Sequence, residues 1–120
     1  MSGKKIVADI TKRILLGETL EEIWFDSYKK LDYARVLIDN FHVDPNIHNK
    51  AGSIALIRAS FEGNIDIVQF LLQRGADPNI KNRAGHTALY WVRTNEIKDL
   101  LKRYDILSKT RVFNTDVYVK

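Results

Sequence analysis

The sequence predicts an all-α solenoid of about three short repeats, with an N-terminal capping helix and an extended C-terminal tail. Two observations carry this prediction. A ten-residue loop sequence occurs twice, 33 residues apart (85 − 52), and the apolar residues between the two copies recur at helical spacing. A repeat of this length is typical of a solenoid, in which each unit buries its apolar face against its neighbours.

The repeated loop is the strongest signal in the chain. Residues 43–52 and 76–85 agree at seven of ten positions: Asp, Pro, Asn, Ile, Asn, Ala and Gly. An Ala-Leu pair beyond the loop recurs at the same offset. Agreement this dense indicates one structural unit used twice.

The segment between the two loops is predicted to form a helical hairpin. Leu56 and Ala59 share one helix face, and Val68 and Leu71 share another, because residues three apart lie on the same side of a helix. Gly63 stands between the two faces, where a tight turn needs a residue that tolerates positive φ.

This unit resembles the ankyrin repeat. Residues 49–81 carry the pattern of that family almost throughout. Gly52 matches the loop glycine of the family, Ala55-Leu56 its Pro-Leu step and Gly63 its turn glycine. The most recognisable stretch of the family is matched by Gly75-Ala76-Asp77-Pro78-Asn79. Two features of the family are missing. Ile54 replaces its usual Thr and Ile57 its usual His, which normally hydrogen-bond between neighbouring loops. We therefore expect a weaker loop on that side. The next unit restores the Thr as Thr87, but Tyr90 again replaces the His.

The flanking units are less regular. The first repeat holds one extra residue near His42, and the last is four residues shorter (15 − 11) around Thr94, as suits a terminal cap. We predict a repeat domain over 1–107 and a tail over 108–120. A capping helix over 3–16 begins the domain, with an apolar side made of Ile6, Val7, Ile10 and Ile14. The repeats that follow span about 19–48, 49–81 and 82–107. The β-prone tail either folds along the last helix or pairs as a strand with a partner.

Charge and composition narrow the classes of function. The net charge is +4, but residues 19–107 hold 12 basic and 12 acidic side chains, so the surplus lies in the flanks. The body therefore lacks the concentrated basic face that nucleic-acid binding usually needs. The chain has no cysteine, which excludes disulfides and thiolate chemistry and fits a reducing compartment. We expect a cytoplasmic protein without a signal peptide or membrane span, leaving the nucleus and secretion into a host cell open.

Catalytic and metal chemistry find no support in the sequence. His42, His48 and His86 lie in or near loops, without the converging ligands that zinc needs. Asp44 and Asp77 occupy equivalent loop positions and are expected to accept hydrogen bonds from local backbone amides. We expect no enzyme activity, no cofactor and no small-molecule substrate.

Several aromatic residues lie in the terminal repeats. They could form a platform that stacks on nucleic-acid bases, but filling core space in place of the family's small residues is the favoured interpretation for Trp24, Phe25, Tyr28, Trp91 and Tyr104.

The resemblance implies a protein-binding function. In ankyrin-repeat proteins, loop tips and the exposed face of the inner helices line a concave groove in which partners dock. On this chain the groove residues would be His48, Lys50, Ser53, Arg58, Phe61, Glu62, Lys81, Arg83, His86, Arg93 and Thr94, with Ala51, Ser60 and Ala84 beside them. The basic members predict a partner protein with an acidic or phosphorylated surface. We expect a monomeric interaction module or scaffold; the alternatives are an inhibitor or effector-type regulator of another protein, or a nucleic-acid-binding accessory protein.

Two details of the groove stay open at this stage. Phe61 is either an exposed hot spot or packs on Tyr28 or Trp91. The resemblance also makes Asn46 and Asn79 possible targets of asparaginyl hydroxylases, although a loop-closing hydrogen bond is the favoured explanation for both.

Overall fold

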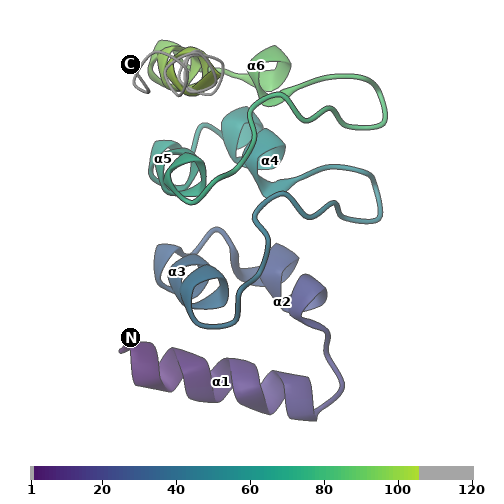
Figure 1. Ribbon diagram of the computed structural model, residues 1–120, viewed down its shortest axis with the longest axis vertical. Coiled ribbons are helices and arrows are strands. Elements are labelled where there is room, and N and C mark those ends of the chain that lie inside the picture. The colour runs from purple at the N-terminus through teal and green to yellow at the C-terminus, as the bar shows by residue number, and fades with distance from the viewer. Residues whose placement is uncertain (1, 106–120) are drawn as a thin grey trace, which may run out of the picture.

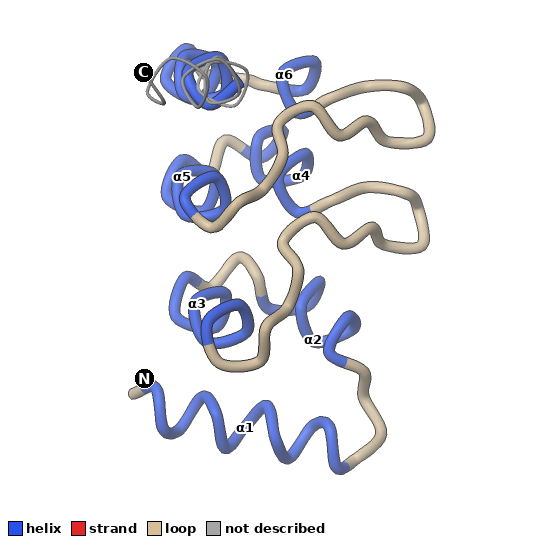
Figure 2. The backbone as a smooth tube through the Cα atoms, in the orientation of Figure 1, coloured by secondary structure: helices blue, strands red, loops and turns tan. Residues whose placement is uncertain are grey.

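The structure is a computed structural model that describes residues 2–105 as a stack of helices with loops projecting from one side (Figures 1 and 2). The helices are α1 (Gly3–Leu15), α2 (Leu20–Ser27), α3 (Leu31–Asp39), α4 (Ala55–Glu62), α5 (Ile65–Gln73) and α6 (Ala88–Trp91), and residues 95–105 are also helical. No strand occurs between residues 2 and 105, so the all-α prediction is confirmed. The predicted tail at 108–120 lies outside the described residues.

The hairpins stack along the long axis of a body measuring 49 × 36 × 24 Å (Figure 1). Helices α2, α4 and α6 form the column nearest the projecting loops, and α3, α5 and the helical residues 95–105 form the column behind it. Helix α4 packs against both α5 of its own hairpin and α6 of the next. This stacking of each unit on its neighbour is the solenoid that the repeat predicts.

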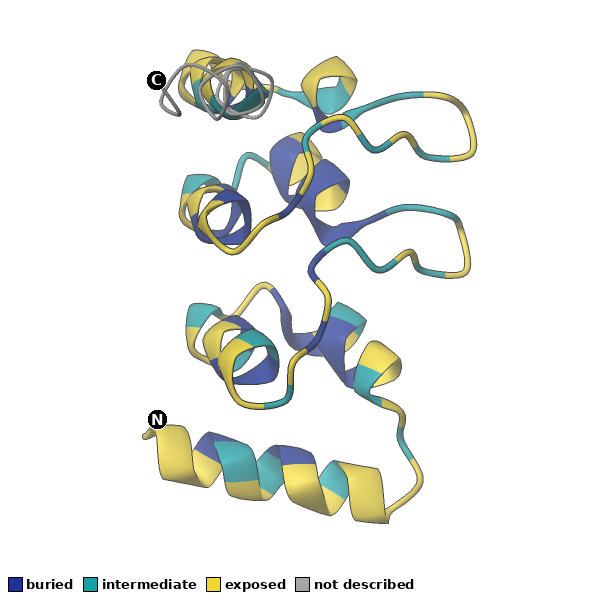
Figure 3. Ribbon diagram, in the orientation of Figure 1, coloured by how far each residue is buried: buried dark blue, intermediate teal, exposed yellow. Residues whose placement is uncertain are grey.

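The apolar core lies between the two columns (Figure 3). Leu56, Val68 and Leu71 of the middle hairpin are fully buried, as their helical spacing predicts. Trp24 and Tyr28 of α2 are also buried, at 0% and 1% exposure. These two aromatic residues therefore fill core space in the first repeat, as the favoured interpretation expects.

Helix α1 covers the N-terminal end of the stack. Its N-cap is Ser2, whose hydroxyl oxygen accepts a hydrogen bond from the backbone amide of Lys5 at 3.4 Å. Ile6 and Ile10 are buried against the first hairpin. Ile14, on the same predicted side, is 37% exposed, so the buried part of that side ends at Ile10.

The first repeat accommodates its extra residue in the turn after α3. In the middle repeat, the amide of Ala76 donates to the carbonyl of Leu71, five residues back, at 2.9 Å. The matching bond in the first repeat runs from Val43 to Leu37, six residues back, at 3.0 Å. His42 sits inside this enlarged turn with φ +60°, the one positive φ outside glycine among the described residues.

Replacing His42 by glycine should raise the free energy of unfolding by about 0.5–1 kcal/mol. The left-handed conformation strains a residue with a Cβ, and the equivalent position of the next repeat is Gly75, with φ +96°. Urea unfolding should show a higher midpoint with an unchanged slope. The matched variant Gly75→Ala should lower stability, and a His42→Gly protein less stable than wild type would contradict this account.

Candidate functional site

The two projecting loops are closed in the same way by an asparagine. Asn49 Oδ1 accepts the backbone amides of Ala51 and Ser53, each at 2.9 Å. One repeat later, Asn82 Oδ1 makes the two equivalent bonds at 3.0 Å. Because two amides converge on one side chain, both loop tips have a fixed shape. The sequence contained this signal, since the asparagine is among the seven agreeing positions, but its role was not predicted.

A second asparagine joins neighbouring repeats. Asn46 Oδ1 accepts the amide of Asp77 at 2.7 Å, and its Nδ2 donates to the carbonyl of Gly75 at 3.2 Å. The carboxylate of Asp44 accepts a hydrogen bond from the backbone amide of Asn46 at 2.9 Å. The carboxylate of Asp77 accepts the equivalent bond from the amide of Asn79, also at 2.9 Å. The predicted backbone-bonding role of the two aspartates is confirmed, and Asn46 ties one loop to the next.

Most of the predicted groove residues are exposed. Only Ser53 and His86 are half-buried, whereas the exposed set is His48, Lys50, Arg58, Phe61, Glu62, Lys81, Arg83, Arg93 and Thr94. The prediction that Ser60 lies on the exposed face of the inner helix is wrong, because its side chain is completely buried. It directly follows the buried Ala59 and faces into the stack of hairpins, so it offers nothing to a partner.

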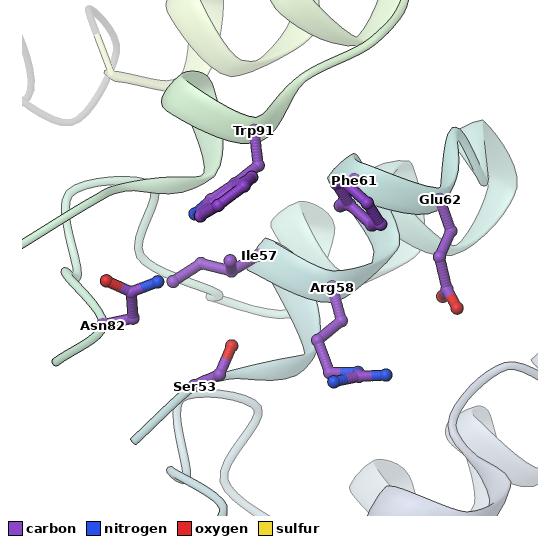
Figure 4. A pocket seen from close by; sticks show the side chains of 7 residues that line it. All are labelled: Ser53, Ile57, Arg58, Phe61, Glu62, Asn82 and Trp91. Carbon is purple, nitrogen blue, oxygen red and sulfur yellow. The ribbon is translucent and has the colours of Figure 1, made fainter. Parts of the chain in front are cut away.

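A hollow of about 320 Å³ opens between α4 and α6 (Figure 4). Four of the predicted groove residues contribute to it, and three residues that the prediction left out complete it; its lining is Ser53, Ile57, Arg58, Phe61, Glu62, Asn82 and Trp91. Ile57 is 4% exposed. Figure 4 shows Ile57 between the two loops and the ring of Trp91, with Arg58 and Glu62 at the rim.

The aromatic walls of this hollow contact one another. The rings of Phe61 and Trp91 meet edge to face, with centroids 5.8 Å apart and planes at 85°. The Arg93 guanidinium lies 5.0 Å from the Phe61 centroid, yet Phe61 remains 45% exposed. Phe61 therefore packs on Trp91, which was one of its two interpretations, and it also remains exposed; its role as a binding hot spot stays a prediction.

His86 and Tyr90 extend this aromatic cluster toward the second loop. Their rings stack with centroids 3.7 Å apart and planes at 7°. Both rings also meet Trp91 edge to face, His86 at 5.4 Å and Tyr90 at 5.2 Å. Trp91 is thereby held on three sides.

The predicted groove residues include five cations without an ion-pair partner in the described part of the chain. Within residues 2–105, no carboxylate forms an ion pair with any of five exposed cations, which are Lys50, Arg58, Lys81, Arg83 and Arg93. The nearby carboxylate of Glu62 is bonded to Lys29 at 2.7 Å, and this bond raises the pKa of Lys29. Burial raises the pKa of the Tyr28 hydroxyl, and the guanidinium of Arg58 opposes that rise. The groove can therefore attract acidic groups.

The two loop tips touch through Arg83. A Cβ added at Gly52 would lie 2.5 Å from Arg83 Cγ, so the arginine stem rests directly on the glycine backbone of the preceding loop. Gly52 has φ +76°, which independently favours glycine. Arg83 thus lies along the groove between the two tips.

Other kinds of site are not visible in the described part of the chain. Between residues 2 and 105, no three His, Asp or Glu side chains come close enough together to hold a metal ion. No helix in this range is both long and apolar enough to cross a membrane.

Trp91 is the site residue that the sequence could have identified. It lies 33 residues after Arg58 (91 − 58), so the repeat offset alone assigns it to the same exposed face of an inner helix. Ile57 was noted as a departure from the family pattern, but its place in the hollow depends on α6 lying above it. That contact is tertiary and has no local signature.

Stacked helical hairpins with projecting loops and a hollow between α4 and α6 define a helical-repeat protein. The family model for ankyrin repeats matches residues 25–110 in three copies. The chain belongs to the ankyrin-repeat family, as its loop sequence predicts, with α1 preceding the matched segment. Among curated proteins, none matches the chain closely enough to count as a relative.

Proposed function

We propose that this chain binds the acidic surface of a partner protein in its groove and catalyses no reaction. Ankyrin repeats are in general protein-interaction modules. The observation that carries the finer proposal is an apolar hollow with Arg58 in its lining and Arg93 over its Phe61 wall. Three further exposed cations lie on the loops, and these are Lys50, Lys81 and Arg83. An apolar centre with a charged rim is the usual composition of a protein interface.

The fixed loops support this proposal. Asn49 and Asn82 hold the shape of each tip, and Asn46 holds one loop on the next. A surface that is already ordered loses little conformational entropy when a partner docks. The repeats therefore act as a rigid frame for the recognition side chains.

Charge reversal tests the proposal. The test variant carries three substitutions, Arg58→Glu, Arg83→Glu and Arg93→Glu. A partner captured from the native host should bind this variant about 10- to 30-fold more weakly, because the introduced carboxylates repel an acidic surface. The control reverses the same number of charges on α1, which lies away from the groove, through Lys4→Glu, Lys5→Glu and Lys12→Glu. Equal effects of the two variants would overturn the proposal.

Salt dependence gives an independent result. Raising the NaCl concentration from about 0.05 M to about 0.5 M should weaken binding, because the Debye length falls severalfold over that range. Affinity that does not change with salt would contradict an acidic partner. A captured partner that is an enzyme and loses activity on binding would make the chain an inhibitor or effector-type regulator.

Nucleic acid is the competing ligand for a basic groove. A gel-shift assay with random duplex DNA separates the two, because binding through phosphates needs no apolar anchor. A shift at about 1 µM protein that the groove reversals abolish would replace the protein proposal with a nucleic-acid one. We expect no such shift.

A further inference from the structure

We propose that the hollow lined by Ile57, Phe61 and Trp91 anchors one large apolar side chain of the partner, an aromatic one, flanked by carboxylates that pair with Arg58 and Arg93. This inference rests on the proposed function and specifies the segment that the groove recognises. It assigns a binding site for an acidic segment with a central aromatic residue.

The floor of the hollow is apolar because of a departure from the family pattern. Ile57 stands where the resemblance leads us to expect histidine, and its side chain is 4% exposed. A histidine there would present ring nitrogens that need hydrogen-bond partners. Isoleucine instead places no polar atom on the floor, so the small part of it that faces the hollow is apolar.

The walls of the hollow are aromatic and held in place. Phe61 and Trp91 meet edge to face, and His86 and Tyr90 hold Trp91 from its other sides. Aromatic rings favour edge-to-face or offset contacts with a further ring. Because the walls are already ordered, an incoming aromatic side chain meets a preformed site of the kind that makes a hot spot.

The rim of the hollow selects for acid. Arg58 is exposed on one side, and Arg93 lies over the face of Phe61 with its guanidinium 5.0 Å from the ring centroid. The one carboxylate of the lining, that of Glu62, is held by Lys29 at 2.7 Å. The rim is therefore net positive, and carboxylates on either side of the anchoring residue complement it.

The size of the hollow suits one inserted side chain. Its volume of about 320 Å³ lies at the lower end of the range of about 300–1,000 Å³ typical of small-molecule sites. The lining takes Ser53 from one loop and Asn82 from the next as well as side chains of α4 and α6, so a segment lying across both loops can insert one residue (Figure 4).

Three synthetic peptides test this inference by NMR titration of the full chain. The first has a central phenylalanine between Asp and Glu residues, the second replaces the phenylalanine with serine, and the third keeps it but replaces each Asp and Glu with Asn and Gln. The first peptide should bind at least about 10-fold more tightly than either of the others, which is a hot-spot-sized effect. Its largest shifts should fall on Ile57, Phe61 and the Trp91 indole.

Variants of the chain locate the effect in the hollow. Ile57→His should bring the affinities for the phenylalanine and serine peptides close together, and Phe61→Ala should do the same without touching the buried core. Lys81→Ala is the matched control, because it removes a groove cation outside the lining. It should weaken both acidic peptides equally and leave their ratio unchanged.

Each outcome decides the inference. Equal affinity for the phenylalanine and serine peptides would overturn the anchor while leaving an acidic partner in place. Equal affinity for the acidic and neutral phenylalanine peptides would overturn the assigned role of the arginines. No detectable shift with the first peptide at about 2 mM would also overturn the anchor. Failure of the proposed function itself would appear separately, as a captured partner insensitive to salt and to the groove reversals.

Discussion

Replacing Leu71 by alanine is expected to lower the free energy of unfolding by about 2–5 kcal/mol. Leu71 lies in α5 of the middle hairpin and is fully buried. Removing its branched end takes apolar surface out of the core and leaves a cavity, and both effects destabilise the folded state. The middle hairpin has neighbours on both sides, so the loss is felt along the whole stack.

The control for this experiment is the same substitution at an exposed leucine. Leu16 follows α1 and is 74% exposed, so Leu16→Ala should change stability by less than about 0.5 kcal/mol. Urea unfolding followed by circular dichroism measures both variants under identical conditions. Similar small losses at the two positions would show that the core does not lie where the structure has it.

Replacing Asn46 by alanine is expected to cost about 1–3 kcal/mol, although the residue lies in a loop. Its side chain bonds to two backbone groups of the next repeat, the amide of Asp77 and the carbonyl of Gly75. Alanine removes both bonds at once and leaves those backbone groups without their partner. Because the bonds cross from one repeat to the next, the loss should also reduce the cooperativity of unfolding.

Asn79 provides a matched control for Asn46. It occupies the equivalent position one repeat later, but its Nδ2 donates to one side chain, that of Asp105 at 2.8 Å, and not to the backbone of a following loop. Asn79→Ala should therefore cost less than about 1 kcal/mol. If the two alanine variants lose the same stability, the bonds between the loops are not what distinguishes Asn46.

The architecture could be predicted from the sequence because it depends on a period. The loop that recurs after 33 residues fixes where each hairpin begins and ends, and the apolar spacing fixes which faces of α4 and α5 are buried. The extra residue near His42 was also predicted, and the structure explains it as a hydrogen-bonded turn enlarged by one residue. The repeat period and the apolar spacing therefore suffice to predict features that form within a single repeat.

Features that depend on a neighbour could not be predicted in this way. Ile14 continues the apolar stripe of α1, but it is only partly covered, at 37% exposure. Ser60 has a polar side chain, which usually indicates a surface position, but it is buried. The contact of Phe61 with Trp91 was one of the alternatives that the sequence left open, because only the position of α6 beside α4 decides among them.

The loop before α4 illustrates how packing replaces a lost hydrogen bond. Ile54 is the N-cap of α4 and makes no side-chain capping bond, but it is completely buried. Thr87, the residue the family prefers, is the N-cap of α6 and makes no side-chain capping bond either. The expected weakening of the loop before α4 remains a prediction, and the burial of Ile54 and Ile57 acts against it.

Site-specific photo-crosslinking in the native host tests most directly whether the groove is the docking surface. A photoreactive amino acid is placed either at Phe61, in the groove, or at Gln69, which is exposed on α5 in the other column. We predict a crosslinked partner from position 61 and none from position 69. A crosslink from position 69 without one from position 61 would contradict the account, because the partner would then bind the opposite side of the solenoid.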